Sequence, residues 1–296
     1  MTDWNSIASE ISHASGTRFR VESVSAVGGG SINAASVLEG NGQRWFVKLN
    51  QASLLGMFEA EAEGLRAMAA TNTVRVPQPL CHGVSGNQAW LVMEFIEPGS
   101  RAYRSEGVRT LGRQLAAMHA CTAASHGWHR DNTIGSTAQH NAWQPDWTTF
   151  WSEQRIGYQL ELAAANGHHG ALQRDGERLL AVMGTLLHGH QPKPSLLHGD
   201  LWSGNANFFS EGQPVIYDPA CYYGDRETDL AMTELFGGFP EDFYAAYREA
   251  WPLDDGYPLR RTLYNLYHIL NHLNLFGGGY AGQAANMISR LLAEVR

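Results

Sequence analysis

The stretch that most constrains how this chain can fold runs from residue 195 to residue 218, where two apolar segments each lead into an acidic residue. The first segment, "SLL", leads through "HG" into Asp200, and Asn205 follows in the same loop. The second segment, "VIY", leads directly into Asp218. Gly212 between the segments predicts a hairpin, and a hairpin brings its two ends together. We therefore expect Asn205 and Asp218 to be neighbours.

This grouping predicts a divalent metal site beside a general base. Mg²⁺ prefers oxygen ligands from one or two side chains, with phosphate oxygens and water completing its coordination. Asn205 and Asp218 supply such oxygens, which leaves Asp200 free to accept the proton of a hydroxyl group. The alternative is that the aspartates only cap loops. The second strand-end aspartate, following the Asp200 and Asn205 pair, argues against that alternative.

The periodicity of apolar residues divides the chain at about residue 96. Before this point, alternating segments and turn signals predict a small β-rich lobe, residues 1–96, with one main helix at 54–70. After a Pro-Gly linker, residues 97–296 should form a larger, mostly helical lobe. Helices are expected there over 105–121, about 147–166, 171–187, 227–236, 240–250, 258–275 and 281–294. The expected fold is α+β and bilobal.

Longer segments resemble the fructosamine (ketosamine) 3-kinase family. The resemblance lies in "LLHGDLWSGN", "VIYDPACYYGDRETDLAM" and "QRIGYQLELAA", it extends to "GGGSINAA" and "LNLFGGGYAG", and it covers essentially the whole chain. It implies a protein-kinase-like fold related to aminoglycoside and choline kinases, with Asp200 as catalytic aspartate and with Asn205 and Asp218 as metal ligands. The resemblance also implies that the chain is an ATP-dependent kinase that phosphorylates the 3-hydroxyl of ketosamines. Its expected role is the repair of glycated amines or proteins.

ATP and Mg²⁺ are the implied cofactors, and a fold of this kind uses a lysine to hold the α- and β-phosphates. Lys48 lies near the end of the third predicted strand, and a glutamate of the next helix should hold it in place. That helix offers Glu59, Glu61 and Glu63, of which Glu61 fits the family pattern best.

Further nucleotide contacts are expected from a loop and from the link between the lobes. Gly29, Gly30 and Ser31 would let backbone N–H groups approach the phosphates, although an ordinary hairpin turn also accounts for these residues. The resemblance implies that Met93 guards the back of the adenine pocket. It also implies that main-chain groups of Glu94 and Ile96 bind adenine.

The acceptor side rests on three aromatic residues. Trp202 directly follows the catalytic turn, where it can stack on a sugar or plug the C-terminal lobe, and the resemblance places it by the acceptor. His268 and His272 are four residues apart on a predicted helix, which is also a zinc-ligand spacing, but no HExxH motif accompanies them. They should line the acceptor cleft or be satisfied in the core. An acid at about Asp229 should brace the catalytic loop from behind.

Composition limits the partners. The net charge of −8 lacks the basic footprint of a nucleic-acid binder, and no apolar run is long enough to span a membrane. Three widely separated cysteines and the absence of a signal peptide favour the cytoplasm. The expected partners are ATP and a ketosamine of the ribulosamine, erythrulosamine or fructosamine type, either as a small molecule or on a glycated protein.

Two other functions stay open. The first is a kinase of an aminoglycoside, choline or a free sugar. The second is a non-catalytic binding protein on a kinase scaffold, which the intact set of Lys48, Asp200, Asn205 and Asp218 argues against.

Overall fold

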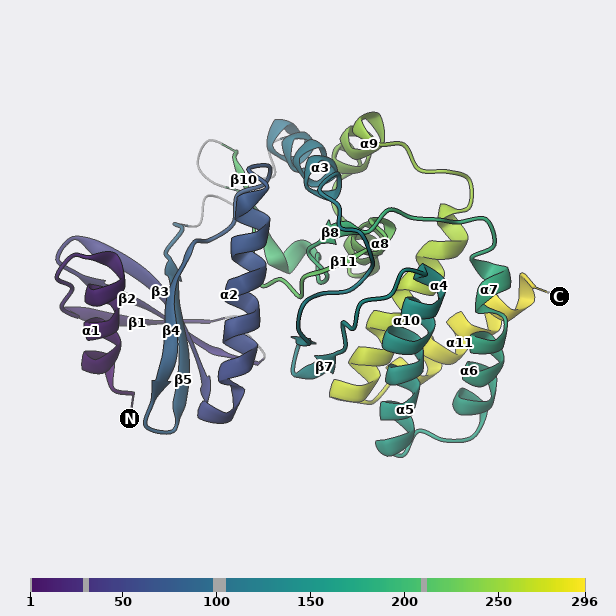
Figure 1. The fold of residues 1–296 in the computed structure, drawn as a ribbon, viewed down its shortest axis with the longest axis horizontal. Coiled ribbons are helices and arrows are strands. Elements are labelled where there is room, and N and C mark those ends of the chain that lie inside the picture. The colour runs from purple at the N-terminus through teal and green to yellow at the C-terminus, as the bar shows by residue number, and fades with distance from the viewer. Residues whose placement is uncertain (1, 29–31, 98–104, 209–211, 296) are drawn as a thin grey trace.

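A computed structural model describes residues 2–28, 32–97, 105–208 and 212–295, and it arranges them in two lobes (Figure 1). The N-terminal lobe is built on a five-stranded antiparallel sheet of order β1-β2-β3-β5-β4. Its elements are α1 (Trp4–Ser15), β1 (Ser23–Val27), β2 (Ala34–Gly40), β3 (Gln43–Gln51), the 3₁₀-helix η1 (Ala52–Leu54), α2 (Leu55–Ala70), β4 (Pro79–Ser85) and β5 (Gln88–Glu94).

The sheet lies between the two helices of this lobe. Helix α1 starts at its cap residue Asp3, whose carboxylate accepts the Ser6 N–H at 3.1 Å, and it packs Ile7 and Ile11 into a small core on one face. Helix α2 covers the other face and lies between the sheet and the C-terminal lobe (Figure 1). Residues of α2 therefore share one continuous core with both lobes.

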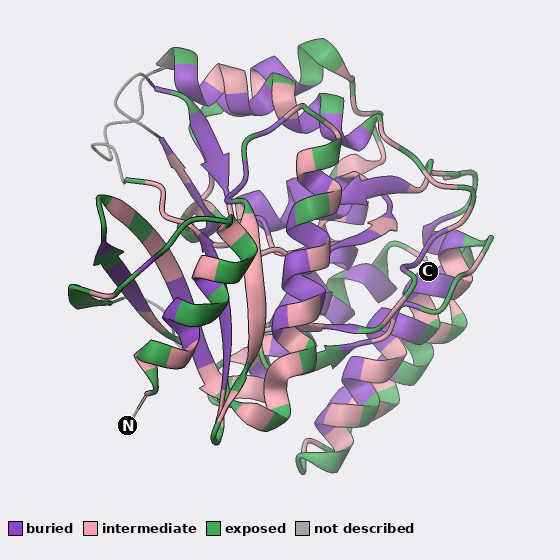
Figure 2. Ribbon diagram, turned by 60° about the vertical axis from the view of Figure 1, so that its left-hand side comes forward, coloured by how far each residue is buried: buried purple, intermediate pink, exposed green. Residues whose placement is uncertain are grey.

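The C-terminal lobe is mostly helical. Its elements are α3 (Ser105–His119), β6 (Asn132–Ile134), β7 (Thr137–Gln139), α4 (Trp147–Trp151), the π-helix η2 (Ser152–Gly157), α5 (Tyr158–Ala165), α6 (Ala171–Ala181), α7 (Met183–Leu186), β8 (Ser195–Leu197), the 3₁₀-helix η3 (Ser203–Asn205), β9 (Ala206–Phe208), β10 (Pro214–Ile216), β11 (Tyr222–Gly224), α8 (Glu227–Leu235), α9 (Glu241–Ala250), α10 (Tyr257–Phe276) and α11 (Tyr280–Ala293). Figure 2 shows buried and exposed residues alternating around these helices, as expected for helices packed on a core.

The predicted α+β architecture is confirmed, and so is the hairpin that carries the polar residues. Strands β9 and β10 pair antiparallel with Ala206 opposite Ile216, and the Tyr217 N–H donates to the Asn205 carbonyl at 3.0 Å. Gly212 has a φ of +75°, a conformation that glycine adopts without strain. The backbones of the two predicted metal ligands are thus held side by side.

Other features differ from the sequence-based expectation. The helix expected over about 147–166 is interrupted by a π-helical segment, η2, and the helix expected over 171–187 is broken at Val182 into α6 and α7. Residues 132–139 form the short hairpin β6–β7. In the part of the chain that the structure describes, we find no helix with both the length and the apolar character needed to cross a bilayer.

Candidate active site

The loop that carries Asp200 is fixed from behind by Asp229 of α8. One carboxylate oxygen of Asp229 accepts the Gly199 N–H at 2.8 Å, and the other accepts the His198 N–H at 2.7 Å. Gly199 has a φ of +82°, and a Cβ on it would lie 2.1 Å from the Ala220 carbonyl oxygen. Only glycine can therefore occupy this position. The backbone conformation of Gly199 sets the direction of the chain from β8 to Asp200.

Asp229 is itself held by a buried histidine, His119 of α3. The His119 Nε2 lies 3.1 Å from Asp229, and its Nδ1 lies 2.7 Å from the Tyr247 hydroxyl. Burial alone would raise the pKa of Asp229, but the hydrogen bond from His119 and the backbone N–H of Gly199 lower it. An ionised carboxylate thus braces the catalytic loop, which is the geometry expected at this position.

His198 connects the two acidic segments. Its ring Nδ1 accepts the Asp200 backbone N–H at 3.2 Å, while Nε2 donates to the Tyr217 carbonyl at 3.0 Å, directly before Asp218. Burial lowers the pKa of His198, so the ring is neutral and can make both bonds at once. The relative position of Asp200 and Asp218 therefore depends on one buried imidazole.

Asp200 and Asn205 are in direct contact. The Asn205 Nδ2 donates to the Asp200 carbonyl oxygen at 2.9 Å and to its carboxylate at 3.3 Å. Because the Nδ2 atom faces Asp200, the amide oxygen of Asn205 points away from Asp200. Burial, followed by the negative charge of Asp218, raises the pKa of Asp200 well above its ordinary value.

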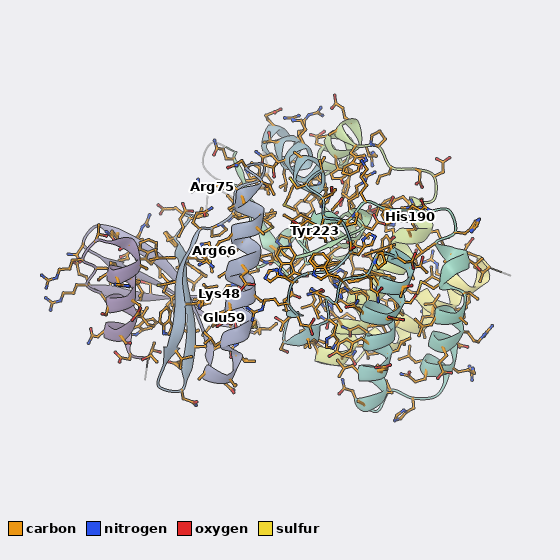
Figure 3. The ribbon with its side chains drawn as sticks, in the orientation of Figure 1. Lys48, Glu59, Arg66, Arg75, His190 and Tyr223 are labelled. Carbon is orange, nitrogen blue, oxygen red and sulfur yellow. The ribbon has the colours of Figure 1, made fainter. Side chains whose placement is uncertain are left out.

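Lys48 lies close to α2 and joins it to the second acidic segment (Figure 3). Its Nζ is 2.6 Å from Glu61 Oε1 and 2.7 Å from Asp218 Oδ1. Burial alone would lower the pKa of Lys48, but the two carboxylates outweigh it and raise the pKa. Asp218 adopts a left-handed backbone conformation, with a φ of +59°, and its side chain is about half exposed, at 47%.

The other two candidate glutamates of α2 make a different contact. Arg130, in the segment between α3 and β6, lies 3.0 Å from Glu63 and 3.2 Å from Glu59, and His129 lies 2.8 Å from Glu63. This cluster joins α2 to the C-terminal lobe. Glu59 and Glu63 are four residues apart on one helix face, where their like charges repel each other. This spacing indicates that a cation from another segment should lie nearby, but it does not identify Arg130 as that cation.

The residues assigned to adenine lie at the end of β5. Met93 is buried between Phe46 of β3 and Pro79 of β4. The Glu94 N–H donates to the Gln78 carbonyl oxygen at 2.8 Å, so of the two main-chain groups of Glu94 only the carbonyl oxygen is left for adenine. Ile96 lies beyond the strand, in the link between the lobes. The assigned phosphate-loop residues Gly29, Gly30 and Ser31 lie outside the described residues.

Two residues after Asp200, Trp202 begins a row of four aromatic side chains in successive ring contact, which we call the aromatic wall. Trp202, with 38% of its area exposed, meets Phe236 edge-on at 6.5 Å between ring centroids. Phe236 lies 4.8 Å from His272, and His272 lies 5.2 Å from Tyr280. The sequence pointed to Trp202 and His272 but missed Phe236 and Tyr280, because only the packing of α8, α10 and α11 brings them together.

The two histidines of α10 differ in their surroundings. His268 is only 4% exposed, contacts the ring of Tyr267, and has its pKa lowered to about 3 by burial. His272 is partly exposed, and its Nδ1 lies 2.8 Å from the His268 carbonyl oxygen. The sequence left open whether these histidines line the acceptor cleft or are buried in the core. His268 is buried in the core, and only His272 belongs to the aromatic wall.

One further cluster has metal-ligand spacing among the described residues. His190, Asp225 and Glu227 have ligand atoms within 4.8 Å of one another, and Figure 3 labels His190 far from Lys48. Arg260, however, holds both carboxylate oxygens of Glu227, at 2.7 and 2.8 Å. The Arg260 guanidinium thus already neutralises the Glu227 carboxylate, and we interpret the cluster as a structural ion-pair network.

Comparisons with known proteins agree on one family. The family model described as fructosamine kinase matches residues 3–294. A Synechocystis protein named probable ketoamine kinase is 50% identical over 290 residues, covering 98% of this chain and 97% of the relative. An Arabidopsis thaliana protein named protein-ribulosamine 3-kinase, chloroplastic, is 44% identical over 285 residues, covering 95% and 86%.

A solved structure supports the same assignment. A crystal structure from Haemophilus somnus, whose description names a fructosamine-3-kinase, is 30% identical and superimposes with a TM-score of 0.90, covering 98% of this chain and 97% of the other. The protein-kinase-like fold implied by the sequence resemblance is thereby confirmed.

Proposed function

This chain belongs to the fructosamine kinase family and is an ATP-dependent phosphotransferase of the ketosamine 3-kinase type, and we propose that Asp200, Asn205, Asp218 and Lys48 carry the transfer. The acceptor is a ketosamine, the adduct of a sugar with an amine, and the hydroxyl that receives the phosphate is the one on carbon 3. The observation that carries the residue assignment is the position of Asp200, on a loop that Asp229 braces and within hydrogen-bond distance of Asn205.

Asp200 receives the proton of the acceptor hydroxyl. As the hydroxyl oxygen forms its bond to the γ-phosphorus of ATP, the bond from that phosphorus to the β-phosphate oxygen breaks and ADP leaves. The raised pKa of Asp200 makes it a stronger proton acceptor than an ordinary aspartate. Its hydrogen bond from Asn205 aims the carboxylate, so most of the catalysis comes from positioning.

The residues beside Asp200 fit a magnesium ion. Asn205 turns its amide oxygen away from Asp200, and Asp218 offers a half-exposed carboxylate on a neighbouring backbone segment. Mg²⁺ usually takes one or two side-chain ligands from a protein that also binds a nucleotide, and these two residues meet that need. When bound, the ion would neutralise phosphate charge. Lys48, held by Glu61, would then contact the α- and β-phosphates.

The remaining assignments complete the nucleotide and acceptor sites. We propose that Gly29, Gly30 and Ser31 cover the phosphates and that Met93, Glu94 and Ile96 form the adenine pocket. Trp202 and His272 would contact the acceptor. We place the lobe boundary between residues 96 and 97. The three cysteines are free thiols, which supports a reducing cytoplasm as the compartment.

Acceptor selectivity is tested by measuring phosphate transfer from radiolabelled ATP to ribulosamine, erythrulosamine and fructosamine, alongside an aminoglycoside and choline. The proposal expects turnover of ketosamines only. Turnover of the aminoglycoside or choline without any ketosamine would overturn it.

Replacing Gly204 by alanine should damage the acceptor site selectively. A Cβ at this position would lie 2.2 Å from the Trp202 indole, so the ring must move off the aromatic wall. We expect the KM for the ketosamine to rise up to about tenfold, the value of a lost aromatic contact, with the KM for ATP unchanged. Steady-state kinetics in both substrates measures this.

The matched control is Gly184→Ala, since a Cβ on Gly184 in α7 meets nothing within 4 Å. An equal rise in both KM values for Gly204→Ala would point to general damage and count against an acceptor role for Trp202.

Replacing Arg130 by alanine should loosen α2. Its contacts to Glu59 and Glu63 connect α2, the helix that carries Glu61, to the C-terminal lobe. Without them, the Lys48–Glu61 ion pair would be formed in a smaller fraction of the molecules. The two glutamates are partly exposed, so each contact is worth about 0.2–1 kcal/mol, and we expect kcat/KM for ATP to fall about 3- to 10-fold.

Arg174→Ala is the control for this charge change, because Arg174 contacts only the neighbouring Asp175 on the surface among the described residues. Identical kcat/KM for ATP in Arg130→Ala and Arg174→Ala would show that the cluster does not position α2.

A further inference from the structure

Asp218 has a backbone conformation that neighbouring groups must hold in place. Its φ of +59° lies in the left-handed region, which is unfavourable for a residue with a Cβ, and the following Pro219 favours an extended conformation instead. Such a conformation persists only where the surrounding structure fixes it. Before Asp218, the Tyr217 N–H donates to the Asn205 carbonyl at 3.0 Å. After Pro219, the chain is fixed by residues that have no assigned part in the reaction.

Two buried side-chain amides of the β6–β7 hairpin bind the backbone after Pro219. The Asn132 Nδ2 donates to the Cys221 carbonyl at 2.8 Å, and the Gln139 Nε2 donates to the Ala220 carbonyl at 3.1 Å. Asn132 is 9% exposed and Gln139 is 1% exposed, so water does not compete for these contacts. Because a buried carbonyl group needs a partner, the two amides determine where the chain lies after Pro219.

The two amides are themselves fixed by a chain of buried side chains, which we call the amide network: Asn132, Gln139, Asn141, Arg155 and Tyr267. The Asn132 Oδ1 accepts hydrogen bonds from Gln139 at 2.8 Å and from Asn141 at 2.9 Å. The Gln139 Oε1 accepts the Tyr267 hydroxyl at 2.7 Å. The Asn141 Oδ1 accepts from Arg155 at 2.7 Å. Turning either amide over would set its oxygen against a backbone carbonyl oxygen, so the network keeps both donors directed at the chain after Pro219.

We propose that Asn132 and Gln139 are positioning residues for the metal: they hold the chain after Pro219 and thereby keep Asp218 in the conformation that binds the ion. The proposal rests on the proposed function, which makes Asp218 a metal ligand. In this conformation the Asp218 carboxylate lies 2.7 Å from the Lys48 Nζ. Without the two donors the chain after Pro219 relaxes, Asp218 leaves the left-handed region, and its carboxylate moves away from the ion.

A purely structural role of the amide network makes a different prediction. It would lower the melting temperature and leave the metal affinity of the folded molecules unchanged, whereas a positioning role lowers that affinity. The contribution of the metal is measured as a ratio, which we call the metal ratio. It is the affinity for the non-hydrolysable nucleotide AMP-PNP in Mg²⁺ divided by the affinity in EDTA, both from calorimetry. The metal ratio is independent of turnover.

Gln139→Met removes the donor and nearly preserves the volume of the side chain. We expect it to lower the metal ratio about tenfold, the lower end of the usual cost of losing a group that orients a metal ligand. The matched control is Gln173→Met on α6, which should leave the metal ratio unchanged. The Gln173 Nε2 also donates to two backbone carbonyls, those of Leu160 at 3.0 Å and His168 at 2.8 Å. Tyr267→Phe removes only the hydroxyl that fixes Gln139, so it should lower the metal ratio less, and it decides the matter if Gln139→Met does not fold.

Asp218→Asn is the reference variant, because it changes the assigned ligand itself. A metal ratio that falls in Asp218→Asn but is unchanged in the folded network variants would overturn this inference alone. An equal fall in Gln139→Met and Gln173→Met would indicate general damage and overturn it as well. An unchanged metal ratio in Asp218→Asn would contradict the assignment of Asp218 as a metal ligand, and the inference would fail with that assignment.

Discussion

Replacing Asp200 by asparagine is expected to lower kcat by about 10²- to 10⁴-fold, the usual contribution of a general base, while ATP still binds. Asparagine keeps the shape of the side chain and cannot accept the hydroxyl proton. The brace from Asp229 acts on the backbone of Gly199 and His198, so it survives the substitution. The measurement is steady-state kinetics together with nucleotide binding by calorimetry.

The same variant should be no less stable than the wild-type protein. Burial and the charge of Asp218 raise the folded-state pKa of Asp200, so its ionisation above about pH 4, the ordinary value, favours the unfolded chain. Removing that charge in the metal-free protein should leave the melting temperature equal or slightly higher at pH 7. A variant with wild-type turnover would refute the assignment of Asp200 as the base.

Replacing Lys48 by methionine is expected to damage both activity and folding. The substitution removes the cation assigned to the α- and β-phosphates and leaves Glu61 buried, with 9% of its side chain exposed, without its partner. Breaking a buried ion pair in this way destabilises a protein by about 3–5 kcal/mol. Losing one phosphate contact should lower kcat/KM for ATP by about 10²- to 10³-fold.

A double variant separates the two effects. Replacing both Lys48 and Glu61 by methionine removes the unpaired charge, and a buried ion pair replaced by apolar residues is often neutral for stability. We expect the double variant to recover most of the melting temperature and none of the activity. Recovery of activity along with stability would mean that Lys48 serves only the fold.

The catalytic loop could be predicted from the sequence because its geometry is local. Asn205 and Asp218 lie at the two ends of one hairpin, and Gly212 marks its turn, so short-range turn chemistry decides their proximity. Lys48 and Glu61 are only thirteen residues apart, on a strand and the helix that follows it. The two-lobe division followed from the change in apolar periodicity.

The parts that escaped prediction depend on contacts between distant segments. Arg130 reaches Glu63 across 67 residues, and no local pattern identifies an arginine as the partner of a particular helix. The aromatic wall joins Trp202, Phe236 and Tyr280 from three elements. The π-helix η2 buries the polar side chains of Gln154 and Arg155 next to Ile156, so the spacing of apolar residues does not reveal it.

The account is tested most directly by locating the phosphate on the product. The wild-type enzyme is incubated with ATP, Mg²⁺ and ribulosyl-lysine, and phosphorus–proton coupling in the NMR spectrum of the product assigns the esterified oxygen. The account predicts a phosphate on the 3-hydroxyl, formed by the wild-type enzyme and not by Asp200→Asn. A phosphate on another hydroxyl, or none on any ketosamine, would contradict it.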